Sequence, residues 1–198
     1  ADFQSADVLT AILIDGREEP LSQPKGVFKA ADGLLYICDT GNARIVAVNE
    51  KREAVRIMTN EGVTAINTHI QYTPEKVAVD TDGNVFVVDP SIYQGIVQYD
   101  AQDRFLGVFA PNEGKVTADV LFLQMWKKWF STEQVESMEK SLPSPYSNLY
   151  IDRDNFLYTS SAGAGAGKAL KHLNMLGVNI LQPAEKKFGH GVFGDLEV

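Results

Sequence analysis

Three segments of this chain share one pattern of residues, and this internal repeat restricts the fold more than any other feature. Each segment begins at a proline (Pro24, Pro74 or Pro145) and continues through apolar runs separated by Asp-Gly, Asp-Asn or other glycine-containing turns. The runs are rich in Val, Ile, Leu, Tyr and Phe, which favour strands, and Asp-Gly supplies the positive φ that tight hairpins need. The pattern predicts an all-β chain whose repeats each form four antiparallel strands, the signature of a β-propeller blade.

The repeats predict a single domain over residues 1–198, with blades at about residues 20–60, 72–112 and 145–182. Three blades fall short of a closed ring, for which about four are the minimum. We therefore expect a partial propeller that belongs to a larger protein or closes its ring with a second copy. Residues 8–14 could supply outer strands of a preceding blade, and residues 193–198 stop where a fourth repeat could begin. Open blade edges also predict self-association.

The first repeat carries the most specific motif, Tyr36-Ile-Cys-Asp39-Thr-Gly41-Asn42-Ala-Arg44-Ile45. This segment resembles the NHL repeat, and the spacing of the resemblance covers about residues 20–181. The second repeat departs from the motif after Asp89, where it has Pro90-Ser-Ile-Tyr93-Gln94-Gly95. The chain is similar to bacterial NHL-repeat proteins described as gluconolactonase-like. That resemblance implies a propeller with a helical insertion in one blade, and it favours the extracytoplasmic cell envelope.

Residues 115–144, between the second and third repeats, change from strand-like to helical spacing of apolar residues. A capping box at Ser131-Thr-Glu-Gln134 would open a second helix, so we expect a helical hairpin here. Trp126, Trp129 and Phe130 are anchors of the kind that partner-binding surfaces use. The same spacing also suits packing onto the propeller, and both interpretations stay open.

Two loops carry candidate ligand contacts. Asp39, Asn42 and Arg44 gather polar groups in the NHL-like segment, although Asp and Asn also bond to nearby backbone in ordinary turns. Tyr93 and Gln94 lie where the second repeat departs from the pattern, and specificity can arise at such departures.

Asp80 and Asp152 follow the first strand of their blades at matching positions. Their carboxylates could converge on a divalent, calcium-like cation, because hard oxygen ligands suit calcium. Lactonases of similar fold hold a divalent cation on the propeller axis with carboxylate and asparagine ligands from several blades, a set that does not map residue by residue onto this chain. The same aspartates equally suit hairpin turns, and no other cofactor is predicted.

Composition and motifs exclude several other classes. With 18 basic and 26 acidic residues the net charge is −8, and the basic residues form none of the clusters that nucleic acid requires. No apolar run approaches the roughly 18 residues of a membrane span. The single cysteine, Cys38, aligns with Val88 and is expected in the core. The chain has no Gly-x-Ser-x-Gly elbow and no histidine pair at metal-ligand spacing.

Two hypotheses from different classes remain. The first is a non-catalytic module that recognises a protein or a carbohydrate. The second is a metal-dependent hydrolase or lyase of the lactonase kind, based on the resemblance and the repeated aspartates. The fold alone does not decide between these two hypotheses, because propellers include both scaffolds and enzymes.

Overall fold

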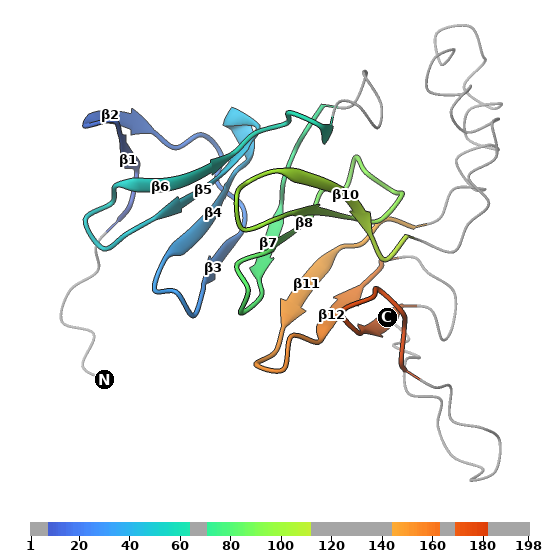
Figure 1. The fold of residues 1–198 in the computed structure, drawn as a ribbon. Coiled ribbons are helices and arrows are strands. Elements are labelled where there is room, and N and C mark those ends of the chain that lie inside the picture. Colours follow the sequence, from blue (N-terminus) through green and yellow to red (C-terminus); the bar gives the residue numbers. More distant parts are fainter. Residues whose placement is uncertain (1–7, 64–70, 112–143, 163–168, 182–198) are drawn as a thin grey trace, which may run out of the picture.

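The structure, a computed structural model, describes residues 8–63, 71–111, 144–162 and 169–181, and it is all-β across them (Figure 1). Its strands form antiparallel sheets of two, four, four and three strands. The two-stranded sheet is a hairpin of β1 (Ala11–Ile14) and β2 (Arg17–Pro20). The first blade consists of β3 (Val27–Lys29), β4 (Leu35–Asp39), β5 (Arg44–Val48) and β6 (Ala54–Met58), and the second blade consists of β7 (Lys76–Val79), β8 (Val85–Val88), β9 (Ile96–Tyr99) and β10 (Phe105–Phe109). The third blade consists of β11 (Asn148–Ile151), β12 (Leu157–Ser160) and β13 (Leu170–Leu173). A short 3-10 turn, η1 (Thr40–Asn42), joins β4 to β5.

Each blade has its strands side by side in sequence order, as the repeat predicts. The third blade differs from the prediction of four strands, because residues 178–181 make only one bridge, between Leu173 and Asn179. The backbone N–H of His172 donates to the Asn179 side-chain oxygen at 3.1 Å, where a continuous ladder would use a backbone carbonyl. The Ile180 N–H still donates to the His172 carbonyl at 2.7 Å, so residues 178–181 keep a short antiparallel pairing with β13.

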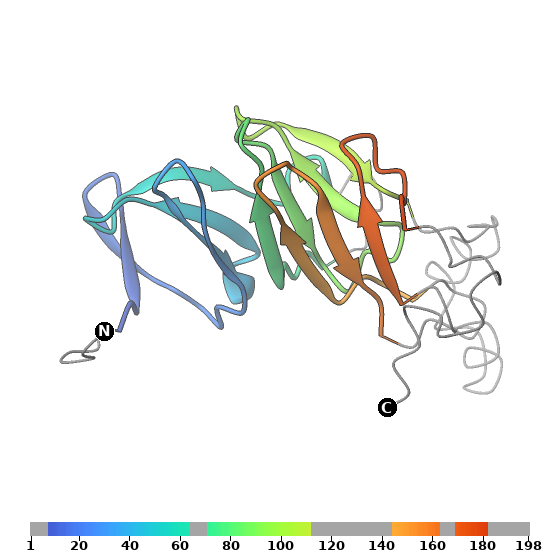
Figure 2. The same ribbon diagram turned by 90° about the horizontal axis from the view of Figure 1, so that it is seen from below.

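Side chains alternate between the two faces of each blade, and both faces of the second blade are buried against neighbours. Figure 2 shows the blades stacked side by side in sequence order. The core between the first two blades contains Tyr36, Cys38, Ile45, Met58, Val77, Val79, Val85, Val87, Val97 and Tyr99. The core between the second and third contains Ala78, Phe86, Val88, Ile96, Ile151, Leu157 and Leu173. The predicted core position of Cys38 is therefore confirmed.

The hairpin β1–β2 covers the remaining face of the first blade. Ile12 packs there with Ile37, Val46 and Val48, and the Leu13 N–H donates to the Arg52 carbonyl at 2.8 Å. This is the face on which a preceding blade would pack.

The helical hairpin predicted over residues 115–144 lies outside the described residues, apart from Ser144. Trp126, Trp129 and Phe130 lie outside them too. In the part of the chain that the structure describes, no helix is long and apolar enough to cross a membrane.

Candidate functional site

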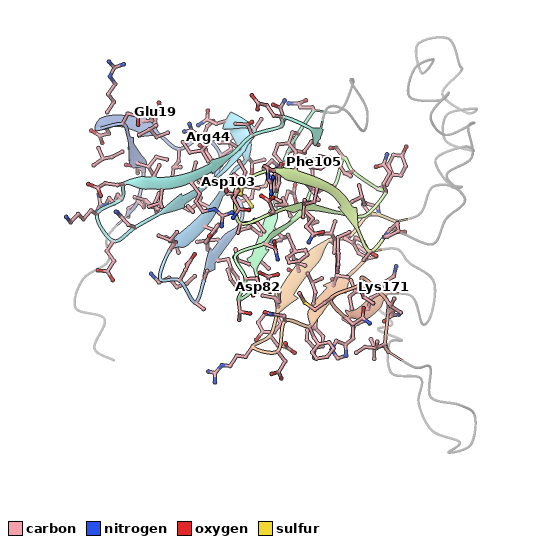
Figure 3. The ribbon with its side chains drawn as sticks, viewed as in Figure 1. Glu19, Arg44, Asp82, Asp103, Phe105 and Lys171 are labelled. Atoms are coloured by element: carbon pink, nitrogen blue, oxygen red, sulfur yellow. The ribbon has the colours of Figure 1, made fainter. Side chains whose placement is uncertain are left out.

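The candidate residues divide between opposite ends of the blades. β3, β7 and β11 run in the same direction, and the turns that follow them lie along the lower edge of Figure 1. This edge, which carries Asp80 and Asp152 and is marked by Asp82 in Figure 3, is called the turn end. Because strands alternate in direction, the loops after β4 and β8 lie at the opposite edge, called the loop end. All five ligand candidates are at the loop end.

Asp39, Asn42 and Arg44 come together around the Asp39 carboxylate, which is fully buried. It accepts hydrogen bonds from the Ser22 backbone N–H at 2.7 Å, Asn42 Nδ2 at 2.8 Å and Arg44 Nε at 2.8 Å. Arg44 also donates to Glu19 of β2 at 2.9 Å, a pair labelled in Figure 3. The network ties the hairpin and the segment before β3 to the first blade.

The Arg44 guanidinium keeps its charge inside this network. Burial by itself would lower its pKa, but hydrogen bonds to Glu19 and Asp39 outweigh that effect and raise the pKa. The Arg44 side chain is only 15 % exposed, so its donors are largely committed to these two carboxylates. Asp39, Asn42 and Arg44 are thus engaged in holding the loop end together.

In the second blade Asp89 takes the place of Asp39, with different partners. Asp89 accepts hydrogen bonds from the Thr73 and Ser91 backbone N–H groups at 2.5 and 2.8 Å, and from both of their hydroxyls. This anchor uses neither Tyr93 nor Gln94. The loop after β8 is therefore fixed at its base by Asp89.

Tyr93 and Gln94 follow this anchor in the same loop. Tyr93 is buried, which raises the pKa of its hydroxyl. The Gln94 Oε1 atom is also buried and has no hydrogen-bond partner within the described residues. Leaving a buried acceptor without a donor typically costs about 1–3 kcal/mol. Gln94 thus offers an acceptor that a donor from outside the described structure would stabilise.

At the turn end, the Asp80 carboxylate braces its own hairpin. One oxygen accepts the backbone N–H groups of Asp82 at 2.9 Å and Asn84 at 2.8 Å, and the other accepts Asn84 Nδ2 at 2.8 Å. The matching position of the first blade is Ala30, which has no carboxylate.

Asp152 braces the third blade in the same way. Its oxygens accept the N–H groups of Asp154 and Phe156 at 3.0 and 2.9 Å, and the Tyr158 hydroxyl at 3.2 Å. No group of three His, Cys, Asp or Glu side chains placed to hold a metal ion is found in the described ranges. Both carboxylates thus brace the turns that follow β7 and β11.

Arg56 of β6 is a connecting residue that the sequence analysis missed. Its guanidinium donates to Tyr36 of its own blade at 2.8 Å, and to the Gly83 carbonyl at 3.0 Å, the Asp100 carbonyl at 2.9 Å and the Asp103 carboxylate at 2.6 Å in the next blade. An arginine among the apolar residues of a strand was the available signal. The partners lie on turns far along the chain, so only the fold identifies them.

A second missed feature is an aromatic surface on the third blade. Tyr150, Tyr158 and His172 are cross-strand neighbours in β11, β12 and β13. The Tyr158 and His172 rings stack with centroids 4.2 Å apart and an angle of 12° between planes. Tyr150 is 60 % exposed, so this surface is open where corresponding surfaces of the other blades are covered.

No protein-family model matches the chain, and no curated protein matches it. Among solved structures it is similar to virginiamycin B lyase from Staphylococcus aureus, with 11% identity, 84% of this chain and 46% of the lyase chain covered, and a TM-score of 0.49. A gluconolactonase from Xanthomonas campestris is 13% identical, with 71% of this chain and 35% of the gluconolactonase chain covered and a TM-score of 0.44. The extracellular domain of a putative one-component system from B. thetaiotaomicron is 16% identical, with 84% of this chain and 18% of that chain covered and a TM-score of 0.42. The chain spans less than half the length of each of these structures.

Proposed function

We propose that the chain is a non-catalytic interaction module of a larger propeller protein, and that its loop end binds a protein or a carbohydrate at Tyr93 and Gln94. The observation that carries the proposal is the buried Gln94 Oε1, which lacks a donor within the described residues. Sugar hydroxyls and peptide N–H groups are both donors of the required kind. A ligand that supplied one would remove the free-energy cost of the unpaired acceptor.

The contrast between the first two blades supports this assignment. In the first blade, Asp39, Asn42 and Arg44 are engaged with one another and with the hairpin. In the second, Asp89 anchors the loop without Tyr93 or Gln94. The three polar residues of the first blade therefore hold the loop end in shape. Tyr93 and Gln94 of the second blade contact the ligand. This division matches the general placement of binding residues on loops held by a rigid scaffold.

Following the resemblance to bacterial NHL-repeat proteins, we place this module in the extracytoplasmic cell envelope. Trp126, Trp129 and Phe130 remain predicted partner anchors beside it. Cell fractionation, with the chain detected in the cytoplasmic fraction alone, would contradict the location without affecting the binding proposal.

The binding proposal is tested with arrays of defined oligosaccharides and of peptides, probed with the full chain. We expect one class to bind and Gln94→Leu to weaken binding by about tenfold or more, as loss of a specific hydrogen bond at a buried site does. The matched control is Gln102→Leu, an exposed glutamine at the turn end, which should bind like the unaltered chain. Equal affinities of the two variants would refute a role for Gln94.

The hydrolase or lyase hypothesis remains the alternative. It requires a divalent cation at Asp80 and Asp152, whose oxygens are engaged with backbone N–H groups of their own turns. The cation test among the predictions below separates it from the binding module.

A further inference from the structure

One face of the third blade has no neighbouring sheet among the described residues, since this blade ends the stack in Figure 2. We call it the outer face. Because side chains alternate along a strand, every second residue of β11, β12 and β13 lies on it. The cross-strand registers assign it six residues: Asn148, Tyr150, Tyr158, Ser160, Leu170 and His172. The opposite face is buried against the second blade through Leu157 and Leu173.

The second blade shows how such a face is buried when a neighbour is present. Tyr158 takes the place of Phe86, because each pairs with the third residue of the first strand of its blade. Leu170 takes the place of Ile96, because each begins the third strand. Phe86 and Ile96 are buried in the core shared with the third blade, whereas Leu170 is 46 % exposed. The outer face thus has large apolar residues at positions that the second blade buries.

The outer face also lacks charge, since none of its six residues is Asp, Glu, Lys or Arg. Two copies of a chain with a net charge of −8 would repel each other through most of their surface, and like charges placed directly opposite are destabilising. The hairpin at the other end of the stack differs, because Arg17 and Glu18 of β2 are exposed there. An uncharged face is therefore the part of the described surface where two copies can meet with the smallest electrostatic cost.

We propose that the outer face of the third blade binds the outer face of a second copy of the chain, with the two copies related by a two-fold axis. A two-fold interface brings the same surface of each copy together, so the surface must complement itself. Tyr150 and Tyr158 supply the large contact area that tyrosines give to interface centres. Asn148 and Ser160 carry groups that both donate and accept hydrogen bonds, so identical residues can pair across the axis.

The packing has a known form, since two antiparallel sheets stack face to face at about 10 Å in a β-sandwich. Ile180 lies at the border of the outer face, where its N–H donates to the His172 carbonyl at 2.7 Å, and its side chain is 40 % exposed. Burial of such apolar side chains supplies the free energy of association. The interface leaves the loop end of the second blade, with Gln94, outside it.

The proposal is tested by light scattering on a dilution series of the full chain, in which a dimer doubles the mass of 21.8 kDa. We expect Leu170→Glu and Leu170→Lys each to weaken the dimer at least about tenfold, because each places like charges in a desolvated interface. An equimolar mixture of the two variants should regain the dimer, since the introduced charges are then opposite. The matched control is Leu106→Glu, a leucine of β10 that is 55 % exposed and lies away from the outer face.

A monomer at every concentration would overturn the proposal, because another blade or another part of the chain would then cover the outer face. A dimer that both Leu170 variants leave intact would overturn it in favour of association through strand edges. A mixture that stays monomeric would show that the outer face meets a different surface, which excludes the two-fold arrangement. Circular dichroism shows that each variant is folded. None of these results depends on a ligand at Gln94, so the proposed function is tested separately.

Discussion

Arg56 of the first blade and Asp103 of the second form an ion pair with 2.6 Å between Nε and Oδ1. The Arg56 side chain is 12 % exposed, and its other donors bind carbonyls on two turns of the second blade. One residue thus holds both turns against the first blade. Gly107 occupies the corresponding position in β10, so the second and third blades have no such connection at that point.

Arg56→Met should lower the free energy of unfolding by about 3–5 kcal/mol, because it leaves buried acceptors unpaired. Urea unfolding followed by circular dichroism measures this. Arg104→Met is the control, since that side chain is 75 % exposed and its ion pair contributes at most about 1 kcal/mol. Similar losses in the two variants would contradict the connecting role of Arg56.

Gly26→Ala should destabilise the chain by about 2–4 kcal/mol, as overpacking at a close backbone contact does. A Cβ atom at Gly26 would lie 2.3 Å from the Glu75 carbonyl oxygen, so the first two blades would have to separate. At Gly16 a Cβ has open space, and only the positive φ of +74° opposes substitution. Gly16→Ala should therefore cost about 1 kcal/mol. Thermal unfolding of both variants gives the comparison, and a milder effect at Gly26 would show that the blades yield easily.

Stability should decline in alkaline solution. Burial raises the pKa of Cys38 from 9.0 to about 12 and that of Tyr99 from 10.0 to about 12, and it raises the pKa of Tyr72 as well. Folding thus favours the protonated forms. Their contribution is fully present below the unfolded pKa values and is lost as the pH rises from about 9 towards 12.

Urea midpoints measured between pH 7 and pH 11 test this prediction. Cys38→Ala should make the decline shallower by up to about 1.4 kcal/mol per pH unit, the contribution of one such proton. An unchanged slope in that variant would mean that the thiol ionises without unfolding.

Calcium should leave the melting temperature unchanged, because the turn-end carboxylates already accept hydrogen bonds from their own turns. Asp80→Asn should lower stability by about 1 kcal/mol, since it weakens the brace of one hairpin. Calorimetry with calcium and with EDTA measures both. A calcium-dependent rise in melting temperature that Asp80→Asn abolishes would instead support the hydrolase or lyase hypothesis.

The sequence predicted the blades well because their signals are local. Asp82-Gly83 marks a turn, and short continuous apolar runs such as residues 85–88 identify strands buried on both faces. The fourth strand of the third blade is only partly formed among the described residues, where Asn179 pairs with Leu173 but its side chain accepts the His172 N–H. Apolar periodicity contains no information on such a hydrogen bond.

The candidate site was predictable only in part. The polar residues from Asp39 to Arg44 are evident in the sequence, but the partner that completes their network, Glu19, comes from a hairpin outside the repeat. The candidate ligand residues lie at the loop end of the blades and the candidate cation ligands lie at the turn end. This separation follows from the alternating direction of the strands, so it could have been predicted. The unpaired Gln94 oxygen could not, because it depends on what surrounds the loop in three dimensions.

The difference between Arg56 and Gly107 also bears on how the chain opens. A stack of repeats is only as cooperative as the weakest junction between neighbours. Amide hydrogens of the third blade should therefore exchange with solvent through partial openings that leave the first two blades intact, whereas those two should exchange together. We therefore expect Arg56 to couple the first two blades more tightly than the second is coupled to the third.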